Sequence, residues 1–248
     1  MCTHALSSTM IDIYTQKTFS GKGPNMPCDA FSPQEKVTLY AYASSNGDPI
    51  GNKLVSFEIH GPHNPYNNIT FFRAALTDEN GVAAISFRTP WPCEQAEEII
   101  FGNWTAYARV EVAEMVATDM MQFLVGRLVE ITSVETGTMQ NSDWMPKDLF
   151  KKGECIGIKL TVKSIAFTDK TAAFTTVGYD CLGVPVAYWK VFSYTVHPGE
   201  KDIIMYCYLF IPKWAFIGIG TIYANAYNTD LKAPYCPETT CTFTVMKD

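Results

Sequence analysis

The sequence predicts an all-β fold of two tandem β-sandwich domains, and three observations support that prediction. Short segments rich in β-branched and aromatic residues alternate with turn residues, long helical periodicity is missing, and the second half of the chain repeats the first at a near-constant spacing. The chain has 248 residues, of which 47% are hydrophobic and 18% charged. That composition excludes a disordered chain and a coiled coil, and it supplies enough apolar residues for packed cores.

The strand signals of the first half are short runs in which apolar and polar residues roughly alternate, so that one side of each run can be buried. They cover residues 37–43, 54–59, 82–87 and 104–112. Turn chemistry separates them, because residues 46–49 and 78–81 contain the Asn, Gly, Asp and Pro that reverse a chain. The stretch 112–121 lacks a clear helix cap, and we interpret it as a loop or hairpin that joins two strands.

An internal repeat indicates a duplicated domain. Phe31 and Glu35 open a pattern that returns at Phe150 and Glu154, 119 residues later. Two further pairs of matching segments, residues 102–108 with 218–224 and residues 122–125 with 242–245, are spaced by 116 and 120 residues. Near-constant spacings indicate duplicated units, with the boundary near residues 126–128. We therefore predict a tail at 1–10, one sandwich at 11–127 and a second at 128–248.

The turn motifs also carry a family resemblance. Residues 77–87, preceded by 47–50 and 55–59, resemble immunoglobulin-like and macroglobulin-type domains of bacterial surface proteins, in which a Thr-Asp-x-x-Gly turn leads into a core strand. The segments 24–31, 91–93 and 234–238 are similar to archaeal extracellular proteins. The resemblance covers residues 11–125 well and 129–248 more loosely. It implies two tandem immunoglobulin-like β-sandwich domains, with scaffolding or adhesion as their role more often than catalysis.

The charge balance and the missing motifs exclude several function classes. The chain has 25 acidic and 19 basic residues, for a net charge of −6, so we expect no nucleic-acid partner. The longest apolar run, residues 203–211, is too short to span a bilayer, and we expect no membrane insertion. No nucleophile elbow, zinc-protease motif or phosphate-binding glycine loop is present, so we expect neither catalysis nor a cofactor. His60 and His63 lack a nearby acid, and we expect no metal.

Eight cysteines are heavy usage for a reducing compartment, and none of them forms a Cys-x-x-Cys pair. We interpret them as structural disulfides of an oxidising compartment; the alternative is buried free thiols. In an immunoglobulin-like sandwich, the loops that contain Cys28 and Cys93 emerge at the same end, so a disulfide between them is geometrically reasonable and would stabilise the domain by roughly 3–4 kcal/mol. Cys236 and Cys241 flank a short loop and form a second candidate pair.

These features favour a protein of the cell surface. Two glycosylation sequons, at Asn68 and Asn103, agree with an extracellular location. The leading hypothesis is a non-catalytic structural or adhesive protein, a subunit of a filament or envelope layer, that associates with itself or with other surface proteins, for example by strand addition from the N-terminal tail. The alternative is a carbohydrate-binding module whose loop aromatics stack on glycans. The candidate aromatics are Trp91, Trp144, Trp189 and Trp214.

Overall fold

A computed structural model describes residues 8–17, 28–63, 68–90, 97–199 and 201–247. It confirms a nearly all-β fold, in which the described helical content is a single turn, α1 (Glu97–Ile100). The chain divides into two compact units, residues 1–126 and residues 127–248. Of the predicted tail at 1–10, residues 1–7 lie outside the described part, and residues 9 and 10 already belong to the first strand.

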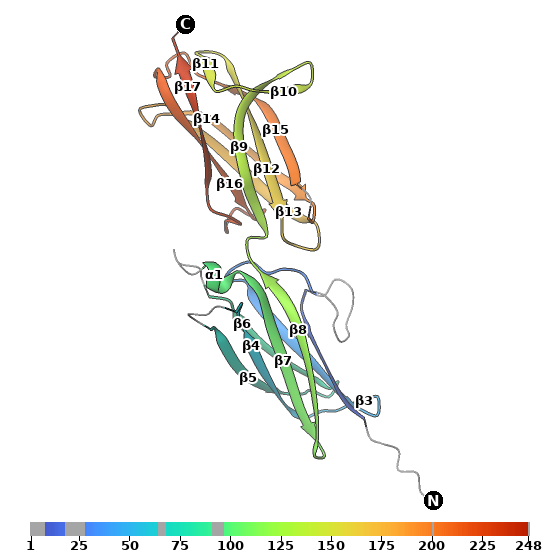
Figure 1. The fold of residues 1–248 in the computed structure, drawn as a ribbon. Coiled ribbons are helices and arrows are strands. Elements are labelled where there is room, and N and C mark those ends of the chain that lie inside the picture. Colours follow the sequence, from blue (N-terminus) through green and yellow to red (C-terminus); the bar gives the residue numbers. More distant parts are fainter. Residues whose placement is uncertain (1–7, 18–27, 64–67, 91–96, 200, 248) are drawn as a thin grey trace, which may run out of the picture. The chain divides into compact units, whose positions relative to one another are not determined.

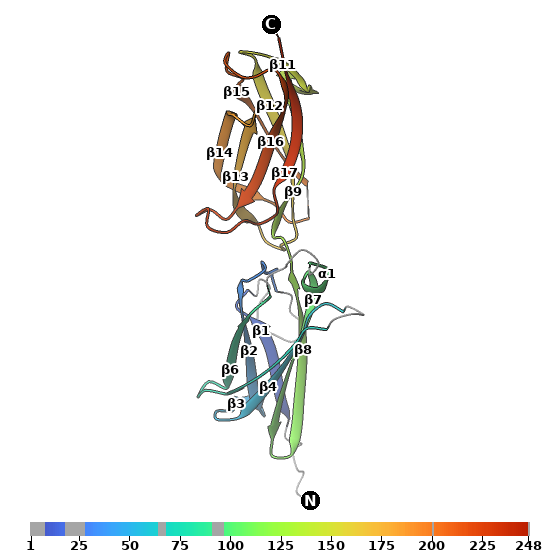
Figure 2. The same ribbon diagram turned by 90° about the vertical axis from the view of Figure 1, so that its left-hand side faces the viewer.

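The first unit is a sandwich of two sheets, drawn in blue to green in Figures 1 and 2. In one sheet β2 lies between β1 and β6 and also pairs with the short β3; the other sheet has the order β5-β4-β7-β8. The strands are β1 (Thr9–Thr15), β2 (Lys36–Ser45), β3 (Asp48–Pro49), β4 (Leu54–His60), β5 (Thr70–Leu76), β6 (Val82–Arg88), β7 (Gly102–Val112) and β8 (Met115–Val125).

The core of the first unit lies between these two sheets and is rich in aromatic residues. Trp104, Phe31 and Phe57 are its largest fully buried side chains. Strict alternation of burial along β4 and β6 shows that one face of each strand packs inward, as the sequence pattern predicted.

Two turns confirm the turn chemistry of the sequence. At residues 78–81, the Asp78 carboxylate accepts hydrogen bonds from the amides of Asn80 and Val82, and the amide of Gly81 donates to the Asp78 carbonyl. Gly81 has a φ of +75°, and a Cβ there would lie 2.6 Å from the carbonyl oxygen of Ala43, so glycine is required. The stretch 112–121 is a hairpin: Ala113, with a φ of +48°, begins the turn between β7 and β8.

The second unit is also a sandwich of two sheets, drawn in yellow-green to red in Figures 1 and 2. Its sheets have the orders β10-β9-β12-β15 and β11-β17-β16-β13-β14. The strands are β9 (Val129–Gln140), β10 (Asp143–Pro146), β11 (Leu149–Lys151), β12 (Cys155–Ser164), β13 (Lys170–Tyr179), β14 (Pro185–Val196), β15 (Lys201–Phe210), β16 (Gly218–Tyr227) and β17 (Thr239–Met246). Phe150, Phe174 and Phe243 are among its fully buried side chains.

The two units share a plan of strands. In each, the second long strand pairs with the first and with a later strand in one sheet, while the last two strands form a hairpin in the other sheet. Phe31 forms a parallel bridge with Val125 in the first unit, and Phe150 pairs in parallel with Val245 in the second. Phe31 and Phe150 are 119 residues apart, and Val125 and Val245 are 120 residues apart, which matches the spacing of the sequence repeat.

The repeated Phe and Glu residues belong to the same local structure in both units, which we call the Lys-Phe-Glu lock. In the first unit, Lys17 Nζ lies 4.5 Å from the centre of the Phe31 ring and 2.6 Å from the carboxylate of Glu35. In the second, Lys147 Nζ lies 5.0 Å from the centre of the Phe150 ring and pairs with Glu154. Each ammonium thus receives a carboxylate and an aromatic face, which holds the buried phenylalanine in place.

The carboxylate of each lock also closes a turn. The amide of Ser32 donates to Glu35 over 2.9 Å, and the amide of Lys151 donates to Glu154 over 2.8 Å. In return, each glutamate amide donates to a carbonyl three residues earlier. The turn that leads into β2 in one unit and into β12 in the other therefore explains why a glutamate recurs four residues after the phenylalanine. Among the described residues, no helix is long and apolar enough to cross a membrane.

Candidate functional site

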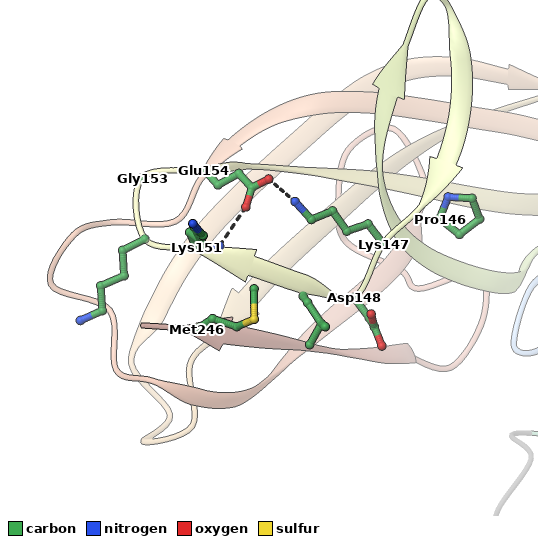
Figure 3. Close-up of a pocket in the computed structure, with 9 residues that line it drawn as sticks. Pro146, Lys147, Asp148, Lys151, Gly153, Glu154 and Met246 are labelled. Carbon is green, nitrogen blue, oxygen red and sulfur yellow. Dashed lines mark hydrogen bonds and ion pairs between the residues drawn. The ribbon is translucent and has the colours of Figure 1, made fainter. Parts of the chain in front are cut away.

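A shallow depression, open to solvent, lies at the end of the second unit where β17 finishes (Figures 1 and 3). It is lined by residues of the β10–β11 connection, the turn after β11 and the end of β17. The lining residues are Pro146, Lys147, Asp148, Leu149, Lys151, Lys152, Gly153, Glu154 and Met246. Figure 3 shows Glu154 between the ammonium group of Lys147 and the backbone of Lys151.

The charged pair in this depression is the Lys-Phe-Glu lock of the second unit. The bonds from Lys147 and from the amide of Lys151 outweigh the effect of burial and hold the pKa of Glu154 below its ordinary value. A depressed carboxyl pKa is the opposite of what a general acid needs at neutral pH. Since the same pair recurs in the first unit between Lys17 and Glu35, the arrangement is explained by turn structure.

Five cysteines whose side chains the structure describes are free thiols. Cys28 is a free thiol, buried in the core of the first unit, where its Sγ lies 3.8 Å from the carbonyl oxygen of Gln122. Its predicted partner, Cys93, lies outside the described residues, so that pairing stays a prediction. Burial raises the pKa of the Cys28 thiol to about 11. Cys155 and Cys181 are also free.

The predicted pair Cys236–Cys241 needs correction, because both residues are free thiols. Cys236 is buried and hydrogen-bonds to the backbone of Ile131 and of Ala226, whereas Cys241 lies within the electrostatic influence of Glu135, further along β9. The two thiols therefore pack against different parts of β9. Burial raises the pKa of both, to about 11 for Cys241. For these two cysteines, the structure therefore supports free thiols, the alternative to a disulfide that the sequence left open.

These environments predict an order of thiol reactivity. A thiol whose pKa is about 11 instead of 9.0 holds about a hundredfold less thiolate. We expect Cys181, which is exposed, to be alkylated faster than Cys28 and Cys241 in the native protein, because burial raises the pKa of those two thiols. Timed alkylation followed by peptide mass spectrometry measures these rates, with the denatured protein as the control. Equal native rates, or a Cys236–Cys241 peptide lighter by two hydrogens, would contradict the structure.

Both candidate glycosylation sites are exposed. Asn68 lies just before β5, and Asn103 is the second residue of β7 with its side chain on the outer face of the sheet. Their amide nitrogens are therefore accessible from solvent, as an attached glycan requires. Glycosylation at Asn68 and Asn103 stays a prediction.

The histidine pair does not form a metal site. His60 Nε2 lies 2.9 Å from Glu58 Oε1, and His60 Nδ1 lies 3.3 Å from the Thr70 hydroxyl. The ring also contacts Tyr107 edge-to-face, so His60 is held by its neighbours on the sheet. Among the described residues, no three His, Cys, Asp or Glu side chains are grouped closely enough to hold a metal ion.

Of the candidate tryptophans whose side chains the structure describes, Trp214 is the exposed one. Trp214, in the loop between β15 and β16, is 58% exposed, and Trp144 in β10 is half-buried. Trp91 and the side chain of Trp189 lie outside the described part of the chain.

Sequence reasoning missed an exposed apolar cluster around Trp214, which we call the apolar tip. Six large apolar residues, each at least 47% exposed, lie at the same end of the second unit, in the turn after β13, at the end of β15, in the β15–β16 loop and at the start of β16. They are Leu182, Phe210, Trp214, Phe216, Ile217 and Ile219. The run Phe216-Ile217-Gly218-Ile219 was visible in the sequence, but such a run is also typical of a buried strand.

The buried carboxylate of Asp180, which the sequence did not predict as a structural residue, connects the two main segments of the apolar tip. Asp180 is only 4% exposed and accepts hydrogen bonds from the amides of Leu182, Val184 and Phe216 over 3.0–3.1 Å. Burial alone would raise the pKa of Asp180, but these three bonds outweigh it and hold the pKa below its ordinary value. The tip is thus fixed by a charge inside the turn.

A second apolar surface covers the outer face of the β5-β4-β7-β8 sheet in the first unit, and we call it the β5 face. Leu54 and Leu76 lie opposite each other at one end, and Phe72 is 66% exposed. Tyr107 and Met120 continue the surface across β7 and β8. Within the described residues, β5 is an edge strand of this sheet, with one side unpaired.

No protein-family model and no curated protein sequence matches this chain. Among solved structures, the chain is similar to bacterial α2-macroglobulins. The native Escherichia coli protein matches with a TM-score of 0.38 and 11% identity over 96% of this chain and 17% of that one. The elastase-activated Escherichia coli form gives 0.40 and 10% over 96% and 22%, and a Salmonella mutant gives 0.37 and 10% over 96% and 16%. This chain thus spans less than a quarter of their length, and the similarity concerns the β-rich fold alone.

Proposed function

We propose that this chain is a non-catalytic structural or adhesive module of a bacterial or archaeal cell surface, and that it acts by associating with further copies of itself. The observation that carries the proposal is the β5 face, where exposed apolar side chains accompany an edge strand with an unpaired side. Monomeric proteins commonly protect such edges with charges or cover them. β5 has one charged residue, Arg73, whose guanidinium donates to the Phe72 carbonyl over 2.8 Å, and the exposed side chains of Phe72 and Leu76 on the same strand can pack against a further strand.

The charges of this face favour a second copy as the partner. Glu58 and Glu111 carry negative charge on the outer side, and Arg109 on β7 carries positive charge among them. A twofold interface brings the same surface from two copies together, so the surface must complement itself. A mixture of both signs beside apolar residues meets that requirement, whereas a surface of one sign would repel its copy.

Association through β5 predicts a concentration-dependent oligomer that a charge on the edge abolishes. In sedimentation velocity, we expect the wild-type chain to shift from monomer to dimer or larger species as its concentration rises. The double variant Phe72→Arg/Leu76→Arg is expected to stay monomeric, because two like charges on each edge would face their counterparts. Ser86→Arg, an exposed position on β6 of the other sheet, is the matched control and should associate like the wild type.

A wild-type chain that remains a monomer at the highest soluble concentration would refute this proposal. Association that survives the double variant but fails with the control would move the interface away from β5. Glycan binding through loop aromatics has less support, because most of the exposed side chains near Trp214 in the sequence are aliphatic or aromatic and lack the hydrogen-bonding groups that orient a sugar.

A further inference from the structure

The apolar tip of the second unit is a rigid surface and not a set of loose loops. Beyond the three bonds to Asp180, the Cys181 thiol donates to the carbonyl of Ile217 over 3.1 Å. The intervening loop is closed by a turn in which the Ala215 amide donates to Pro212, with Ala215 itself fully buried. Trp214 and Phe216, on either side of Ala215, therefore face outward because their neighbour is anchored inward.

Lysines surround this surface. Lys213 precedes Trp214 and is exposed. The turn that carries Lys151 and Lys152 is joined to the end of β15, because the amide of Gly153 donates to the carbonyl of Ile211 over 2.7 Å and the Ile211 amide donates to Glu154 over 3.0 Å. Three lysines therefore border the apolar tip.

The acidic groups near these lysines are mostly neutralised. Glu154 is paired with Lys147, and the charge of Asp180 is buried against three backbone amides. Asp148 is the exposed carboxylate among the residues that line the neighbouring depression. The tip is thus locally basic in a chain whose net charge is −6, and this contrast favours an anionic partner.

An anionic lipid surface fits this combination better than a protein or a glycan. Aromatic and aliphatic side chains on protruding loops can enter the headgroup region of a bilayer, while lysines around them reach the phosphates. Tryptophan is favoured at that depth because its ring is amphipathic. We propose that the apolar tip docks this protein peripherally on a bilayer that contains anionic lipids, without crossing it. This contact is independent of the β5 face, so either proposal can fail alone.

Vesicle co-sedimentation of the full chain tests the proposal. Vesicles of phosphatidylcholine mixed with phosphatidylglycerol should bind the protein at least tenfold more tightly than pure phosphatidylcholine, and added salt should weaken the binding. Trp214→Ser/Phe216→Ser should weaken binding to the mixed vesicles by tenfold or more. Phe167→Ser, an exposed aromatic residue between β12 and β13 that belongs to neither proposed surface, is the matched control and should bind like the wild type.

Two further measurements separate the contribution of the lysines to vesicle binding from that of the apolar side chains. Lys151→Glu/Lys213→Glu should remove the preference for the anionic vesicles while the apolar residues stay. Brominated lipids should quench tryptophan fluorescence in the wild type and much less in Trp214→Phe, which keeps an apolar ring at that position. No binding to the mixed vesicles, equal binding to both vesicle types, or a loss of binding that soluble glycans cause by competition would each overturn the proposal.

Discussion

Replacing Trp104 by alanine is expected to destabilise the first unit by about 3–5 kcal/mol, the range for removing a large buried aromatic side chain. Trp104 is fully buried and stacks on Phe71 and Phe123 at centroid distances of 6.1 and 6.2 Å. Its indole nitrogen donates to the carbonyl of Ile100 over 2.8 Å. Alanine would leave a large cavity between the two sheets and an unpaired carbonyl beside it.

Hydrogen exchange of the full chain, followed by mass spectrometry, reports this loss separately for each unit. Amides of β4, β7 and β8 should exchange faster in Trp104→Ala, while those of β12, β13 and β16 keep their wild-type rates. Trp104→Phe is the graded control and should lose less, because it keeps an aromatic ring in the stack. Equal protection of β7 in wild type and Trp104→Ala would show that this tryptophan is not the centre of the core.

Asp180→Ala is expected to destabilise the second unit by about 3 kcal/mol, because three partly buried amides lose their acceptor at once. The amides belong to Leu182, Val184 and Phe216, so the change also releases the β15–β16 loop from the turn after β13. Faster exchange should therefore appear at residues 211–217 first. An Asp180→Ala variant with wild-type protection there would contradict the assigned role of this carboxylate.

The same carboxylate gives the second unit a defined acid sensitivity. Because the pKa of Asp180 is lower in the folded chain than in the unfolded chain, its contribution to stability is fully present above the ordinary carboxyl pKa of about 3.9. That contribution is lost as the pH falls below this value towards the folded pKa. Calorimetry across this range should show the loss in the wild type and a flatter profile in Asp180→Asn, which cannot ionise.

The strands and the duplication could be predicted from sequence because both depend on local patterns. Alternation along residues 54–59 and 82–87 fixes which side chains face inward, and the structure shows that burial. Phe31 and Glu35 recur as Phe150 and Glu154 because each pair serves the same lock. The lysines of the lock could not be recognised from the repeat, because their spacing differs between the units. Lys17 precedes Phe31 by 14 residues, whereas Lys147 precedes Phe150 by 3.

The candidate sites were harder to predict because they depend on contacts between distant segments. Asp180 and Phe216 are 36 residues apart, and nothing in either segment shows that one carboxylate satisfies amides in both. Cysteine spacing misled for a similar reason: only four residues lie between Cys236 and Cys241, yet Cys236 bonds to the backbone of β9, whereas Cys241 lies within the extended strand β17. Exposure of an apolar run such as residues 216–219 likewise follows from the tertiary fold.

The parallel pairing of Phe31 with Val125, and of β11 with β17, has a mechanical consequence. In each unit a short early segment runs alongside the final strand in the same direction, tied by bonds such as Phe31 to Leu124 at 2.8 Å and Thr244 to Asp148 at 2.7 Å. These bonds hold an early segment of each sandwich to its last strand. Detachment of the last strand therefore frees the early segment as well, so that these two parts of a sandwich open together.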